Sequence, residues 1–151
     1  MRIAIASDHA GFRYKEQIKT VLLEGGYEVK DFGTHCAEPV DYPDIVRSAA
    51  EAVANGEFER GIVLGGSGNG EAMVANKTAG IRCAVCWDLL SGRLSREHND
   101  ANMLSLGERM MPIHKVLEIV ELWLNTPFEG GRHKRRVENI EKNQKDVTVF
   151  L

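Results

Sequence analysis

The chain has 151 residues, a length that fits one domain and allows a sizeable hydrophobic core. Apolar residues make up 43% and charged residues 27% of it, which excludes an intrinsically disordered chain and a coiled coil. The net charge of −3 disfavours nucleic-acid binding, and no apolar run approaches the roughly 18 residues that span a bilayer. Three cysteines give no disulfide framework, and residues 1–6 lack the apolar core of a signal peptide. We therefore expect one cytoplasmic domain over residues 1–151.

The first half of the chain alternates apolar strands with amphipathic helices. Residues 3–6 are typical of a buried strand, and the helical spacing of apolar residues that follows ends at Gly25. A second strand is expected over 27–32. Residues 38–43 contain two prolines and are expected to form a loop, after which Asp44 can cap a helix.

The second half continues the alternation and ends on a basic helix. The expected elements are a strand at 61–64, a glycine-rich loop at 65–70, a helix at 71–77, a strand at 81–87, a helix at 89–97, a strand at 102–106, a helix from 112, a basic helix at 132–145 and an apolar tail at 147–151. Alternating strands and helices predict an α/β fold, in which a parallel sheet of five strands carries helices on both faces. Ligands of such sheets bind beyond the carboxyl ends of the strands.

The glycine-rich loop does not match the nucleotide motifs it resembles in spacing. Gly65 and Gly70 are spaced as in a P-loop, but Glu71 stands where that motif requires lysine. Gly66 and Gly68 fit the start of a dinucleotide fingerprint, but its third glycine is replaced by the same glutamate. A carboxylate at this point would repel a nucleotide phosphate.

Proton-transfer chemistry suits the loop better. Backbone N–H groups over 66–70 can stabilise a developing oxyanion, Ser67 can hydrogen-bond a substrate, and a partly desolvated Glu71 can act as a general base. The structural alternative is that the glycines only form a tight turn and that Glu71 complements a helix dipole.

Other polar residues also have two interpretations each. Asp8 and His9 follow the first strand and are either a helix cap with an exposed histidine or part of a site. His98, in the polar stretch 95–102, is either a surface residue or a proton shuttle. Arg132 and Arg136 are four residues apart and share a helix face, either as a solvated basic helix or as a phosphate clamp that Arg109 joins.

The cysteines do not form a recognisable functional motif. Cys83 and Cys86 have C-x-x-C spacing, but a zinc site needs a second ligand pair, which Cys36 alone does not supply. Because both lie in an expected strand, where residues three apart face opposite sides, we interpret them as structural.

Five motifs occur in an order that resembles a known family. They are the residues 7–12 (SDHAGF), 41–43 (DYP), the loop 65–70 followed by 75–77 (ANK), 95–102 (SREHNDAN) and 129–133 (EGGRH). Together they resemble the type B ribose-5-phosphate isomerases, whose family includes the galactose-6-phosphate isomerase subunits, over roughly residues 1–142. The resemblance implies a Rossmann-like α/β/α sandwich that interconverts ribose 5-phosphate and ribulose 5-phosphate. It also implies a homodimer or dimer of dimers with active sites at the subunit interface, and no metal or cofactor.

The resemblance also implies a role for each candidate residue. Many members carry a catalytic cysteine where this chain has Gly65, whereas a second subgroup uses a glutamate at the end of the loop, which here is Glu71. That glutamate would move the proton between C2 and C1 through an enediolate, with His98 opening the furanose ring, Asp8 assisting and Ser67 positioning the substrate. The expected substrate-binding residues are Asp8, His9, Tyr42, Gly66, Ser67, Gly68, Asn69, Gly70, Asn99, Arg109, Arg132 and Arg136.

Three alternatives remain open at this stage. The same chemistry can act on a four- or six-carbon sugar phosphate, because pocket size decides the substrate. A non-catalytic nucleotide-binding module would be indifferent to Glu71→Gln, and a redox protein that uses Cys83 and Cys86 would be abolished by thiol alkylation.

Overall fold

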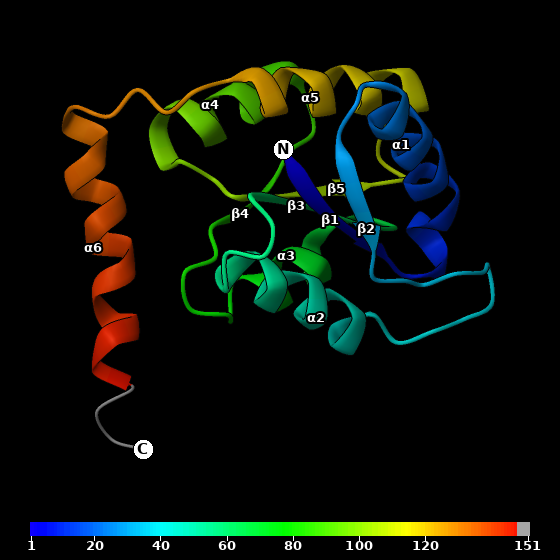
Figure 1. Ribbon diagram of the computed structural model, residues 1–151, viewed down its shortest axis with the longest axis horizontal. Coiled ribbons are helices and arrows are strands. Elements are labelled where there is room, and N and C mark those ends of the chain that lie inside the picture. Colours follow the sequence, from blue (N-terminus) through cyan, green and yellow to red (C-terminus); the bar gives the residue numbers. More distant parts are fainter. Residues whose placement is uncertain (148–151) are drawn as a thin grey trace.

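Five parallel strands form the centre of the protein (Figure 1). The computed structural model describes residues 1–147, with side chains up to residue 142. The strands are β1 (Arg2–Ser7), β2 (Glu28–Asp31), β3 (Arg60–Gly65), β4 (Cys83–Val85) and β5 (Met103–Gly107). Their spatial order is β2-β1-β3-β5-β4, so the chain reverses direction across the sheet after β2. The expected α/β fold with a five-stranded parallel sheet is confirmed.

Helices cover both faces of this sheet. They are η1 (His9–Gly11), α1 (Phe12–Glu24), α2 (Tyr42–Ala54), α3 (Asn69–Ala75), α4 (Leu89–Asn99), α5 (Ile113–Asn125) and α6 (Arg132–Val147). Figure 1 shows α1, α4 and α5 on one side of the strands and α2 and α3 on the other. None of the helices among the described residues is both long enough and apolar enough to cross a membrane.

Alternation along the strands divides the core into two layers. On β1, Ile3 and Ile5 pack with α1 and α5, whereas Ala4 and Ala6 pack with α2 and α3. The small residues Ala49 and Ala50 of α2 face these alanines, so this second layer is thin. Because both faces of β1 and β3 are covered, their residues read as continuous apolar runs.

Strand order places one crevice at the carboxyl ends of β1 and β3. The chain leaves β1 toward one edge of the sheet and leaves β3 toward the other, so the two connections diverge there. The residues that follow these strands are Asp8 and the glycine-rich loop. In open α/β sheets this switch point is where ligands bind.

Two local expectations are wrong. Asp41, not Asp44, is the N-cap of α2, because Pro43 is compatible with the first helical turn, where its missing N–H is not needed. The strand expected over 81–87 is only Cys83–Val85, because the side-chain amide of Asn76 binds both the N–H and the C=O of Cys83 at the outer edge of the sheet.

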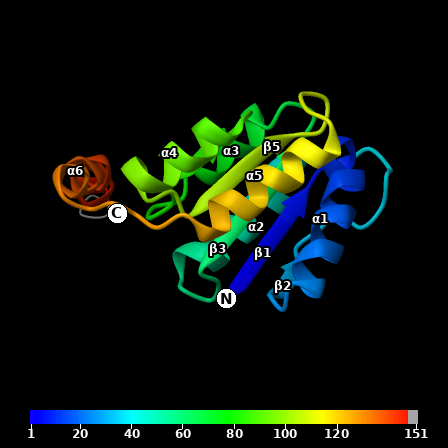
Figure 2. The same cartoon turned by 90° about the horizontal axis from the view of Figure 1, so that it is seen from above.

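The basic helix α6 stands apart from the sheet (Figure 2). The break at Gly130 and Gly131 is confirmed, since both have positive φ, and α6 begins at the next residue as expected. Ion pairing of Arg82 with Glu141 ties the helix to the body. Of the apolar tail expected at 147–151, residues 148–151 lie outside the described residues.

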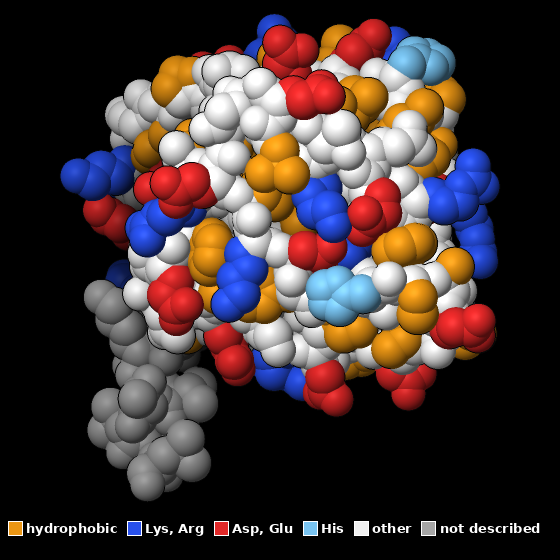
Figure 3. Space-filling model, turned by 45° about the vertical axis from the view of Figure 1, so that its right-hand side comes forward, with side chains coloured by type: hydrophobic (Ala, Val, Ile, Leu, Met, Phe, Trp, Pro, Cys, Tyr) orange, Lys and Arg blue, Asp and Glu red, His pale blue; other side chains and the backbone are white. Residues whose placement is uncertain are grey.

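Charges of both signs are mixed on the surface. On the face shown in Figure 3, acidic and basic side chains alternate with apolar ones, and neither sign forms a continuous field. This mixture agrees with the small net charge of the chain.

Candidate active site

Asp8 and Glu71 meet in the crevice between β1 and β3. Asp8 follows β1, is 8% exposed and accepts a hydrogen bond of 3.0 Å from the N–H of Gly11, which makes it the cap of η1. Glu71 lies in the first turn of α3 and is 3% exposed. Burial raises the pKa of Glu71, and the charge of Asp8 together with a hydrogen bond between the two side chains raises it further. The pair is therefore a proton-accepting site that retains its proton at a higher pH than a free carboxyl group.

Gly65 makes room for the carboxylate of Glu71. A Cβ atom at position 65 would overlap with the carboxyl carbon and with Oε1 of Glu71, and would lie 2.6 Å from its Oε2. A side chain at position 65 and the observed position of Glu71 are therefore mutually exclusive.

The remaining glycines of the loop allow other close approaches. Gly68 has φ +85°, and its carbonyl oxygen accepts a hydrogen bond of 2.6 Å from Ser105 Oγ. A Cβ at Gly70 would overlap with the hydroxyl group of Tyr42, and one at Gly66 would lie 3.2 Å from Nη1 of Arg109. Tyr42 and Arg109 thus lie directly against the loop.

Ser67 and Asn69 form the exposed part of the loop. Ser67 Oγ accepts a hydrogen bond of 3.2 Å from the N–H of Asn69 at the start of α3. Both residues line a cavity of about 240 Å³ together with Cys86, Trp87 and Met110.

His9 is held in one orientation beside Asp8. Its Nδ1 accepts a hydrogen bond of 3.1 Å from the N–H of Val40, so in the neutral ring the proton is on Nε2. The half-buried ring can therefore donate from Nε2 to an anionic group.

The other predicted site residues lie at the opposite edge of the sheet. Helix α4 starts after β4, at the carboxyl edge, and ends with His98 and Asn99 shortly before β5 begins at the amino edge. At about 3.3 Å per residue, the length of β5 separates the two edges by roughly 13 Å. Arg132 and Arg136 are exposed on α6, whose first turn lies against His98. One chain therefore does not bring these four residues to Glu71.

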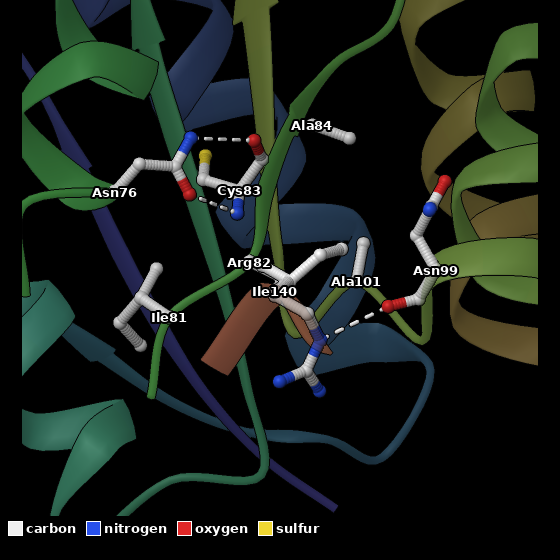
Figure 4. Close-up of a pocket in the computed structure, with 8 residues that line it drawn as sticks. All are labelled: Asn76, Ile81, Arg82, Cys83, Ala84, Asn99, Ala101 and Ile140. Atoms are coloured by element: carbon white, nitrogen blue, oxygen red, sulfur yellow. Dashed lines mark hydrogen bonds between the residues drawn. The ribbon is translucent and has the colours of Figure 1, made fainter. Parts of the chain in front are cut away.

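Asn99 lines a second cavity, of about 360 Å³, beside the edge strand β4 (Figure 4). Its carbonyl oxygen accepts a hydrogen bond of 2.9 Å from Nε of Arg82. Ile140 of α6 closes this cavity from the other side. The residues that line this cavity include no carboxylate and no histidine.

Cys83 and Cys86 are in environments that favour the neutral thiol. Burial raises the pKa of Cys86 to about 11, and burial also raises the pKa of Cys83. All three cysteines are free, and only Cys36 is exposed. Since the thiolate is the reactive form, these environments disfavour the redox alternative.

Comparison with known proteins decides the family. A family model described as Ribose/Galactose Isomerase matches residues 3–140. The chain belongs to this family. It is 46% identical to the ribose-5-phosphate isomerase B of Escherichia coli over 139 residues, which cover 92% of this chain and 93% of that protein.

Solved structures of isomerases agree with this assignment. The ribose-5-phosphate isomerase B of Clostridium thermocellum matches with a TM-score of 0.96 and 51% identity, covering 97% of this chain and 99% of that one. The enzyme from Mycoplasma genitalium, solved with bound ribulose-5-phosphate, matches with a TM-score of 0.92 and 36% identity over 95% and 96% of the two chains. The resemblance to the type B isomerases is confirmed, and the chain is a sugar-phosphate isomerase.

Sequence reasoning missed one cluster in this isomerase. His133 is buried and its ring is stacked on that of His98, with the centroids 4.2 Å apart and the planes at 12°. Glu129 Oε2 lies 3.4 Å from Nε2 of His133. The four-residue spacing from Glu129 to His133 is a signal that could have indicated this contact, but the basic neighbours at 132–136 led us to interpret His133 only as added charge.

Proposed function

We propose that this isomerase interconverts ribose 5-phosphate and ribulose 5-phosphate, with Glu71 as the base. The observation that supports this assignment is the buried carboxylate of Glu71 beside Asp8, placed where Gly65 leaves space for it. The Escherichia coli and Clostridium thermocellum relatives are ribose-5-phosphate isomerases, and the Mycoplasma genitalium enzyme binds ribulose-5-phosphate. These relatives favour the five-carbon substrate over four- and six-carbon sugar phosphates.

In the proposed reaction, the carboxylate of Glu71 removes the proton from C2 of the open-chain aldose. The electrons of the broken C–H bond form a C1=C2 double bond, and the carbonyl electrons move to the oxygen at C1. The hydroxyl proton on the C2 oxygen then passes to the C1 oxygen, the C2 oxygen becomes the carbonyl, and Glu71 returns its proton to C1. No electron leaves the substrate, so no redox cofactor is required. A raised pKa makes Glu71 a stronger base than an exposed carboxylate once it is ionised.

We assign to the glycine-rich loop the stabilisation of the negative charge that develops on the substrate oxygen. Backbone N–H groups of Gly66, Ser67, Gly68, Asn69 and Gly70 surround the start of α3, where the partial positive charge of a helix is concentrated. Asn69 N–H already binds Ser67 Oγ, so we assign the oxyanion to the other donors. Tyr42, beside Gly70, forms the adjoining wall.

Ring opening requires a second copy of the chain. His98 is the proposed acid and base for that step, yet it lies at the amino edge of its own sheet, away from Glu71. A symmetric dimer in which His98 and Asn99 of one copy approach the glycine-rich loop of the other would complete two identical sites. Arg132 and Arg136 would arrive with them and hold the phosphate together with His9 and Arg109.

The first test is turnover of ribose 5-phosphate by the purified protein beside the Glu71→Gln variant. Loss of a general base lowers kcat by about 10²- to 10⁴-fold, while the shape of the side chain is kept. A silent parent protein would refute the five-carbon substrate, and an active variant would refute the base.

The shared site has a test of its own. Glu71→Gln and His98→Asn copies are each expected to be nearly inactive, but a mixed dimer contains one site with both residues intact. Random 1:1 exchange gives mixed dimers in half of the population, so activity should recover to about a quarter of the parental level. No recovery after verified exchange would place both residues in one chain's site.

A further inference from the structure

A set of possible metal ligands lies where α4, the loop before α6 and α6 itself meet. His98 ends α4, Glu129 is in the loop, and His133 is in the first turn of α6. One ligand atom from each of the three side chains lies within 4.8 Å of the others. Among the residues whose side chains the structure describes, this is the one such group of three or more.

The distances suit a tetrahedral ion. Zinc bonds of about 2.0–2.1 Å to nitrogen and oxygen separate two ligand atoms by roughly 3.4 Å in a tetrahedron. Glu129 Oε2 and His133 Nε2 are already 3.4 Å apart. A ligand atom of His98 lies within 4.8 Å of both. Because its ring is stacked on that of His133, the half-buried His98 must rotate out of the stack to point a lone pair at the shared ion.

The lone pair on Nε2 of His133 accepts only a long hydrogen bond when no metal ion is bound. Arg132 Nε donates a long hydrogen bond of 3.5 Å to Nε2 of this ring, and Glu129 Oε2 lies 3.4 Å from the same nitrogen. A neutral imidazole nitrogen facing a carboxylate oxygen is the arrangement that a divalent ion joins.

The position of Glu129 is fixed by the backbone. Its N–H donates a hydrogen bond of 3.1 Å to the carbonyl oxygen of Glu97 in α4, so the loop is tied to the helix that carries His98. The ligands therefore come from segments that are held together before any ion arrives. Arg132 and Arg136 oppose a cation here, and the carboxylate of Glu129 is the charge that offsets them.

We propose that His98, Glu129 and His133 form a binding site for Zn²⁺ that inhibits the enzyme. Three protein ligands leave a fourth position open to water. The inhibitory effect rests on the proposed function, because a bound ion occupies the nitrogen of His98 that ring opening uses. Binding of the ion itself does not depend on that role.

Binding is tested with Co²⁺, whose visible absorption reports tetrahedral coordination, and with Zn²⁺ in competition against it. We expect one ion per chain in the parent protein. Loss of a ligand in Glu129→Gln or His133→Ala should weaken binding by about tenfold or more. Glu129→Gln is the decisive variant, because this half-exposed side chain contributes little to the core, whereas His133 is buried.

His35→Ala and His114→Ala are the matched controls, since both histidines are exposed and neither belongs to the cluster. They should bind the ion as the parent does. Absence of saturable binding, unweakened binding in Glu129→Gln, or loss of binding in either control would overturn the proposed site.

The effect on activity is measured separately. Zn²⁺ should slow turnover of ribose 5-phosphate reversibly, with recovery on chelation, and Glu129→Gln should need about tenfold more Zn²⁺ for the same inhibition. If the ion binds through Glu129 and the parent enzyme turns over normally, the inhibitory role is refuted while the site remains. If the ion binds and the parent shows no isomerase activity, the proposed function fails and the site remains.

Discussion

Gly65→Ala tests whether the position of the Glu71 carboxylate is what the enzyme needs. The added Cβ would overlap with the carboxyl carbon of Glu71 and lie 2.6 Å from Oε2, against an ordinary contact of 3.4 Å or more. The atoms it meets are the far end of a flexible side chain, so Glu71 moves and the fold remains. A base displaced by about 1 Å loses roughly 100-fold in rate, and loss of the base altogether costs up to about 10⁴-fold. We expect kcat to fall within this range.

The assay compares kcat and KM for ribose 5-phosphate with thermal unfolding of the same preparations. The φ angle of Gly65 is not positive, so alanine itself introduces no backbone strain, and the unfolding midpoint should not fall. Gly25→Ala is the control, because its Cβ would meet only contacts of 3.4 Å in the last turn of α1. Parental kcat in a folded Gly65→Ala protein would refute the placement of the base.

Four further outcomes follow from the geometry. The raised pKa of Glu71 means that its contribution to stability is present below the ordinary glutamate pKa of 4.5 and is lost as the pH rises through the raised value. Glu71→Gln should therefore gain in free energy of unfolding over the parent as the pH rises above about 4.5, measured by urea titration. Arg136→Ala should raise KM more than it lowers kcat, and an unchanged KM would reduce Arg136 to a surface charge. His98→Asn should lose less activity on an aldose phosphate that cannot cyclise than on ribose 5-phosphate, and equal losses would contradict a role in ring opening. Iodoacetamide should label exposed Cys36 without loss of turnover, because the pKa of Cys86 is about 11, and parallel loss of activity and free thiol would contradict this.

The sequence predicts the layers of this fold because each element has its own pattern. β1 and β3 are apolar on both faces, and the helix stop at Gly25 and the break at Gly130 before α6 are local signals. The length of β4 is not a local property. Its ladder with β5 is short, and its outer edge is covered by the side chain of Asn76, a contact that the apolar pattern of residues 81–87 does not indicate.

The two halves of the predicted site differ in how they can be found. Asp8 and the glycine-rich loop each follow a strand directly, so topology alone places them at one edge. His98 precedes a strand, and the same reasoning places it at the opposite edge; the polar stretch around it does not reveal that separation unless the strand order is considered. The stacking of His133 on His98 depends on the path of the loop at 126–131, which carries no periodic signal.

Opposing effects act on Glu71, and their balance is what makes it usable as a base. Its place in the first turn of α3 and a hydrogen bond from its own backbone N–H favour the charged form. Burial and the nearby charge of Asp8 favour the proton, and these win. A carboxylate with the first set of contacts alone would be a weak base, and one with the second set alone would resist ionisation. The glycine at position 65 and the helix that starts after Gly68 together hold the group between these limits, at a cost in stability that Glu71→Gln is expected to recover.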